Sequence, residues 1–78
     1  MKKKIDVDFY RKMKYDYVKN MSRHTKSWDE FNDNLSLYCA CTGLAVYVAI
    51  VFAEEEFPMF SKQLEAKRKV VKEFYGYE

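Results

Sequence analysis

Apolar side chains recur at helical spacing through the first third of the chain. Successive members are three, four, one and three residues apart, so they share one face of a helix: Tyr10, Met13, Tyr17, Val18 and Met21. Phe9 widens this face. The pattern predicts an amphipathic first helix over about residues 7–23, followed by a short polar connection.

A capping signal marks the start of a second helix. Ser27 and Glu30 form an S-x-x-E capping box, in which the serine hydroxyl accepts a hydrogen bond from the Glu30 backbone N–H. No strong helix breaker follows before Pro58, because a single interior glycine, Gly43, costs only about 1 kcal/mol relative to alanine. The pattern therefore predicts one continuous helix over about residues 28–56.

Pro58 is suited to the first position of a third helix, since the N–H that proline lacks would have no helical acceptor there. The predicted element covers about residues 58–75. Its apolar residues have near-heptad spacing, with the aliphatic stem of Lys67 completing the seam. They are Phe60, Leu64, Val71 and Phe74.

These elements predict an all-α fold. We expect a three-helix single domain over residues 1–78, in which a long central apolar helix packs between two shorter amphipathic helices. The composition agrees, because 49% of the residues are hydrophobic and only two are glycine and one is proline. Two short helices cannot cover the long one on every side, so we expect oligomerisation to complete the fold, preferably as a twofold dimer.

A stripe of small side chains gives one candidate surface for that contact. Small residues recur every fourth position along the second helix, which would allow another helix to approach closely. They are Cys41, Ala45, Ala49 and Ala53. The alternative is that this stripe faces a neighbouring helix of the same chain.

An uncharged run at residues 35–53 raises the possibility of a membrane protein. Its 19 residues reach the length of a single transmembrane span. However, acidic residues flank the run on both sides and no basic residue near it sets an orientation. We therefore expect a cytoplasmic protein, with a single-pass membrane protein spanning residues 35–53 as the alternative.

Charge alternates in sign along the chain, although the net charge is only +2. Residues 1–26 carry a net +6, residues 27–57 a net −6, and residues 58–78 a net +2. The simplest account is that the basic outer segments lie near the acidic ends of the middle one, in the same subunit or another. Glu54, Glu55 and Glu56 occupy a predicted helix C-terminus, where negative charge is unfavourable, and so call for cations from the first helix or from a target protein.

Residues that could carry out catalysis are scarce. His24 is the only histidine, Cys39 and Cys41 are the only cysteines, and two glycines cannot build a glycine-rich phosphate loop. A tetrahedral zinc site would need more ligands than one chain supplies. We therefore expect no enzymatic activity, no cofactor and no metal, with both cysteines reduced and packed as small apolar residues.

Basic and aromatic residues are interleaved along the first helix. Aromatic rings can stack on bases while lysine and arginine contact phosphates, so this helix is a candidate for binding nucleic acid or a nucleotide. The residues concerned are Arg11, Lys12, Lys14, Tyr15, Lys19 and Arg23. Three aspartates dilute this surface, and an ordinary basic helix face is the simpler interpretation.

The leading functional hypothesis is a small non-enzymatic protein-binding module. It would act stoichiometrically on a macromolecular partner, as an inhibitor or accessory protein. In size and composition the chain is similar to small accessory products of mobile elements, including phage-like accessory proteins. Aromatic anchors and clustered charges are the candidate partner contacts. They are Trp28, Glu54, Glu55, Glu56, Tyr75 and Tyr77.

Overall fold

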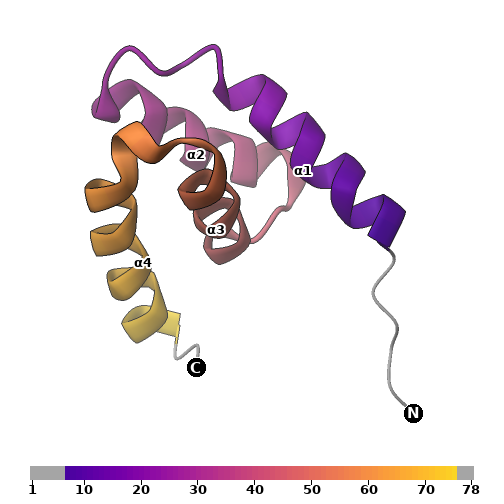
Figure 1. Ribbon diagram of the computed structural model, residues 1–78. Coiled ribbons are helices and arrows are strands. Elements are labelled where there is room, and N and C mark those ends of the chain that lie inside the picture. Colours follow the sequence, from indigo (N-terminus) through magenta and orange to yellow (C-terminus); the bar gives the residue numbers. More distant parts are fainter. Residues whose placement is uncertain (1–6, 76–78) are drawn as a thin grey trace.

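The computed structural model describes the backbone of residues 7–75 and the side chains of residues 8–74. This part of the chain contains four α-helices, one short 3-10 helix and no strand (Figure 1). In order they are α1 (Val7–Met21), α2 (Trp28–Thr42), α3 (Val46–Glu56), η1 (Pro58–Phe60) and α4 (Ser61–Tyr75). The all-α class is confirmed, whereas the predicted three-helix arrangement, with one long apolar helix between two shorter ones, is not.

The continuous helix predicted over residues 28–56 is interrupted after Thr42. Gly43 has a φ of 79°, in the left-handed region that glycine adopts readily, and its N–H donates to the Cys39 carbonyl at 2.8 Å. The Thr42 hydroxyl donates to the Tyr38 carbonyl at 2.8 Å and accepts from the Leu44 N–H at 3.2 Å. Gly43 therefore ends α2 as its C-cap instead of being tolerated within a longer helix.

The interruption divides the uncharged run between two short helices. α2 has 15 residues and α3 has 11, against the roughly 20 that a transmembrane helix needs. Within residues 7–75, no helix is both long enough and apolar enough to cross a membrane.

The predicted capping signal operates at the start of α2. The Ser27 hydroxyl accepts from the Glu30 N–H at 3.2 Å, and the serine backbone is extended, as expected at an N-cap. The Glu30 carboxylate lies 3.1 Å from His24 Nδ1 and so ties the α1–α2 connection to the first turn of α2. α1 itself ends at Met21, two residues before the predicted end.

Phe57 and Pro58 separate α3 from α4. Pro58 disfavours helical geometry at the residue before it, and Phe57 has φ −128° and ψ 70°. Pro58 begins η1, which leads directly into α4. The chain thus reverses direction and packs α4 against α3 (Figure 1).

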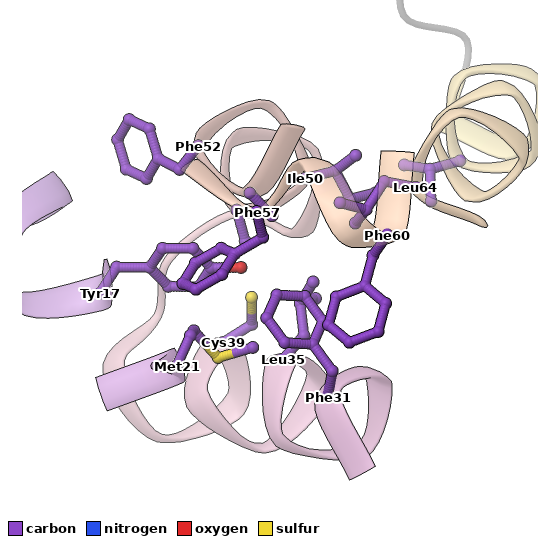
Figure 2. Close-up of a cluster of buried hydrophobic side chains, with 13 residues drawn as sticks. Tyr17, Met21, Phe31, Leu35, Cys39, Ile50, Phe52, Phe57, Phe60 and Leu64 are labelled. Carbon is purple, nitrogen blue, oxygen red and sulfur yellow. The ribbon is translucent and has the colours of Figure 1, made fainter. Parts of the chain in front are cut away.

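The core forms around α3, which contacts α1, α2 and α4. Figure 2 shows aromatic side chains from several elements meeting in this core. The Phe31 ring lies 5.0 Å from the Phe57 ring and 4.7 Å from the Phe60 ring, between centroids. Tyr17 reaches in from α1, where its ring packs 5.8 Å from that of Phe52. Both groups of rings belong to one buried hydrophobic core, which joins α1, α2, α3 and η1.

The apolar face predicted for the first helix is largely buried in this core. Tyr17 and Met21 are fully buried, and Met13 and Val18 pack against the core while half-buried. Tyr10 is more exposed, but its ring meets that of Phe52 edge-on at 5.3 Å. A hydrogen bond of 2.7 Å from Asn34 to the Asn20 side-chain oxygen adds a polar link between α1 and α2.

Candidate interaction surfaces

The acidic residues at the end of α3 are bound by cations from both outer helices. Lys14 Nζ of α1 lies 2.7 Å from a Glu55 carboxylate oxygen and 3.0 Å from one of Glu56. Arg68 Nε of α4 lies 2.8 Å from Glu54 Oε1. The expectation that basic outer segments approach the acidic middle segment is confirmed within one subunit. The three carboxylates, predicted as partner contacts, are thus engaged in holding the helices together.

These contacts also affect the ionisation of the cations. Hydrogen bonding to Glu55 and then to Glu56 raises the pKa of Lys14, and hydrogen bonding to Glu54 raises the pKa of Arg68. Sequence reasoning suggested a cation from the first helix for this cluster but did not find Arg68. The sequence does not single out Arg68 as the partner of Glu54, because Arg68 is one of three consecutive basic residues in α4.

Trp28, predicted as an exposed aromatic anchor, is half-buried and contributes to the packing of the chain. It lies at the first position of α2, with its ring 6.1 Å from that of Phe31 and 5.7 Å from that of Phe60. The other two aromatic candidates cannot be placed in the same way. Tyr75 ends α4, but its side chain lies outside the described residues, as does the whole of Tyr77.

The small-residue stripe predicted as an oligomer contact is not continuous, since α2 ends at Thr42. Ala49 and Ala53 are fully buried inside the chain, in agreement with the alternative that this part of the stripe faces neighbouring helices of the same chain. Cys41 and Ala45 are exposed on either side of the break. Only this half of the stripe is accessible to a partner.

The basic residues predicted to contact nucleic acid lie mostly on the exposed side of α1. Arg11, Lys14 and Tyr15 come together around a surface hollow of about 260 Å³, and the Lys19 ammonium lies 6.0 Å from the Tyr15 ring centroid. The same hollow is also lined by Glu56, and Lys14 is engaged by two carboxylates. A phosphate would therefore meet a partly neutralised surface here. The other two candidates, Lys12 and Arg23, are exposed outside this hollow.

The outer side of α4 carries an apolar surface that the sequence pattern assigned differently. Phe74, predicted to lie in the core, is 78% exposed, and Val70, one helical turn before it, is 64% exposed. Met59 of η1 is 60% exposed. The remaining members of the predicted seam, Phe60, Leu64 and Val71, are buried as expected.

Phe74 lies in the last turn of α4, beyond the buried members of the seam. Because the chain reverses between α3 and α4, the last turn of α4 lies toward the beginning of α3 (Figure 1). α3 spans about 16 Å and α4 about 22 Å at 1.5 Å per residue, so α3 is too short to cover that last turn. The uninterrupted helix predicted over residues 28–56 would have continued across it.

The described side chains offer little reactive chemistry. Burial raises the pKa of the Cys39 thiol, which lowers its thiolate fraction and its reactivity. Within the described part of the chain, no group of three or more histidine, cysteine, aspartate or glutamate residues is placed to hold a metal ion.

Comparison with known proteins identifies no relative: no protein-family model, curated protein or solved structure matches this chain.

Proposed function

We propose that the protein is a small non-enzymatic binding module that acts stoichiometrically on a macromolecular partner, as an inhibitor or accessory factor. The observation that carries this proposal is a pair of large exposed apolar residues one turn apart on α4, Val70 and Phe74, called here the α4 surface. Scattered exposed apolar residues are ordinary, but large apolar residues aligned one turn apart on a helix are typical of partner binding.

The charges around the α4 surface indicate the chemistry of its partner. Lys62, Lys69 and Lys72 are exposed on α4, where Glu65 and Glu73 are the acidic residues. Glu65 lies 3.9 Å from Lys69 and partly offsets it. The border of the α4 surface is therefore only slightly basic, because Glu73 lies next to Phe74 and one turn after Val70. A partner with an apolar groove and an acidic rim fits it best, since complementary charge favours encounter and orientation.

A site-specific photo-cross-link would test this function. Phe74 would be replaced by a photoreactive phenylalanine analogue, with the same analogue at the exposed Tyr15 of α1 as a positional control. We expect one dominant, saturable product with a protein from the native source, formed from position 74 and not from position 15. A product formed only from position 15 and destroyed by nuclease would favour nucleic-acid binding instead.

Competition with unlabelled protein makes the test quantitative. Excess wild-type protein should abolish the product, whereas the V70E/F74E double variant should compete at least about tenfold less well, because charge placed in an apolar contact must be desolvated. Leu37→Glu, which adds charge at an exposed leucine of α2, should compete like the wild type. Equal competition by all three proteins would exclude the α4 surface as the binding site.

A further inference from the structure

The turn between α2 and α3 borders two surface hollows. One, of about 480 Å³, is lined by Phe9 and Met13 of α1 and by Tyr38 and Thr42 of α2. The other, of about 410 Å³, is lined by Ser36, Cys39, Ala40, Val46 and Tyr47. Leu44 and Ala45 line both hollows and form their shared boundary. We call the turn and its two hollows the turn surface.

The turn surface differs from the rest of the chain in its charge. Residues 34–53 contain no charged side chain, so the turn and the α2 and α3 residues beside it are neutral. Among the residues that the structure describes, the only charged ones that line either hollow are Lys12 and Asp16, both at the larger one. They have opposite charges and lie one helical turn apart on α1.

We infer that the turn surface is the contact through which two copies of this chain form a twofold dimer. In a twofold contact the same surface is used by both copies, so it must be complementary to itself. The turn surface can meet this requirement, because the exposed Ala45 lies between the two hollows and Ala45 of each copy can approach a hollow of the other. Lys12 of each copy can then face Asp16 of the partner subunit, which gives two equivalent charge pairs across the twofold axis.

A second copy fits this surface better than an unrelated basic or acidic partner does. The protein carries a net charge of +2, which disfavours self-association through its basic faces, but the turn surface brings together neutral groups and one mutually compensating charge pair. Apolar cover is also what a chain of this length needs, because a small domain buries a limited fraction of its surface alone. The contact is separate from the α4 surface and does not depend on the proposed function.

Ala45 allows the contact to be disrupted without weakening the fold. It is exposed, has the extended φ of −65° and ψ of 137° of an N-cap residue, and makes no side-chain cap hydrogen bond to α3. Asp and Ser are both good N-cap residues, so Ala45→Asp and Ala45→Ser should each preserve or increase the stability of α3. Only the aspartate places a charge in the dimer contact, and the serine variant is therefore its matched control.

The oligomeric state of the three proteins tests the proposal directly. Mass would be measured by light scattering and sedimentation equilibrium from low micromolar to near-millimolar concentration, with circular dichroism to follow folding. We expect the wild type and Ala45→Ser to be dimers, and Ala45→Asp to be a folded protein whose dimerisation is at least about tenfold weaker. A wild type that stays monomeric, or a dimer that Ala45→Asp leaves intact, would overturn the proposal.

Cys41 supplies a second, independent measurement. It is exposed between Ala40 and Thr42, which line the two hollows, whereas Cys39 is buried. A flexible bismaleimide should join Cys41 to Cys41 of the partner subunit in the wild type. The cross-link should disappear in Cys41→Ser and weaken in Ala45→Asp. A wild-type dimer that gives no Cys41 cross-link would have its interface elsewhere and would contradict the proposal.

Discussion

Tyr17 combines good packing with an unfavourable polar group. Its ring lies 5.2 Å from that of Tyr38 and 5.8 Å from that of Phe52, and the side chain is fully buried. Its hydroxyl oxygen, however, is buried and has no hydrogen-bond partner among the residues that the structure describes. Figure 2 shows this side chain pointing from α1 into the core. The ring therefore stabilises the contact of α1 with the core, while the desolvated hydroxyl opposes it.

Removal of that hydroxyl should stabilise the protein. We expect Tyr17→Phe to raise the free energy of unfolding by about 1 kcal/mol, and hence the Tm by roughly 4–8 °C for a domain of this size. Urea and thermal unfolding followed by circular dichroism would measure the effect. Tyr15→Phe, at an exposed position of the same helix, should change little. A loss of stability in Tyr17→Phe would show that the hydroxyl is hydrogen-bonded in the native protein.

The same burial predicts sensitivity to alkaline pH. Desolvation raises the pKa of Tyr17 above the ordinary tyrosine value of about 10, so above that pH the unfolded chain loses this proton while the folded chain keeps it. The stability contributed by Tyr17 is therefore complete below pH 10 and falls as the pH rises further, by at most about 1.4 kcal/mol per pH unit.

Comparison with Tyr17→Phe isolates this contribution from other groups. Burial also raises the pKa of Cys39 and Tyr38, so some alkaline loss should remain in the variant. Denaturant titrations between about pH 8 and pH 12 should show a shallower decline of the unfolding free energy for Tyr17→Phe than for the wild type. Parallel curves would mean that the Tyr17 hydroxyl ionises without a folding penalty.

At the scale of the elements, Gly43 determines the arrangement of the helices. A Cβ added at Gly43 would meet nothing within 4 Å, so steric contact does not require glycine there. The requirement comes from its positive φ, which costs a residue with a Cβ about 1–2 kcal/mol. We therefore expect Gly43→Ala to lower the free energy of unfolding by about that amount, and Gly43→Asn to lower it by less because asparagine tolerates this region better.

Denaturant unfolding of the two Gly43 variants would measure these costs, and circular dichroism would report the helix content. An alanine variant that gains both helix content and stability would contradict the expectation. It would mean that α2 and α3 can join as the continuous helix that the apolar pattern alone indicates.

The helix boundaries show which features of the fold could be predicted from the sequence and which could not. Ser27 was identifiable as an N-cap because its side chain and Glu30 make a local bond that needs no other part of the fold. Gly43 was ambiguous, because a glycine costs about 1 kcal/mol inside a helix but is also the favoured C-cap residue. The contacts that decide between these two roles of Gly43 include the packing of α2 on α3, and this packing exists only after the chain has turned.

The α4 surface was missed for the same reason. The seam spacing placed Phe74 with Leu64 and Val71, and a longer second helix would have covered all three. In the structure α3 begins at Val46, and Phe74 is exposed in the last turn of α4. A residue expected in the core thus lies on the surface that carries the proposed function.

At the scale of the whole molecule, charge alternation along the sequence becomes a contact between helices in space. Lys14 joins α1 to the end of α3, and Arg68 joins α4 to the same end. Both outer helices are thus held at one acidic segment, Glu54 to Glu56, next to the reversal at Pro58. Exposed ion pairs add only about 0–1 kcal/mol each, so they select the orientation of the helices more than they stabilise the core.

Charge reversal at Lys14 should test this orientation effect. We expect Lys14→Glu to lower the free energy of unfolding by about 1 kcal/mol, because it removes two attractive contacts and adds repulsion with Glu55 and Glu56. Arg23→Glu makes the same charge change at an exposed residue of the α1–α2 connection and should have a smaller effect. Denaturant unfolding at low and high salt would measure both variants, and salt should reduce the Lys14→Glu effect.

The reciprocal exchange completes this test. In the double variant K14E/E55K, the opposite charges are restored with their positions exchanged, so part of the lost stability should return. That recovery would identify the loss in Lys14→Glu as an interaction with the end of α3 and not as a change in net charge. If the double variant is no more stable than Lys14→Glu, the pairing between α1 and α3 does not contribute to holding these helices in place.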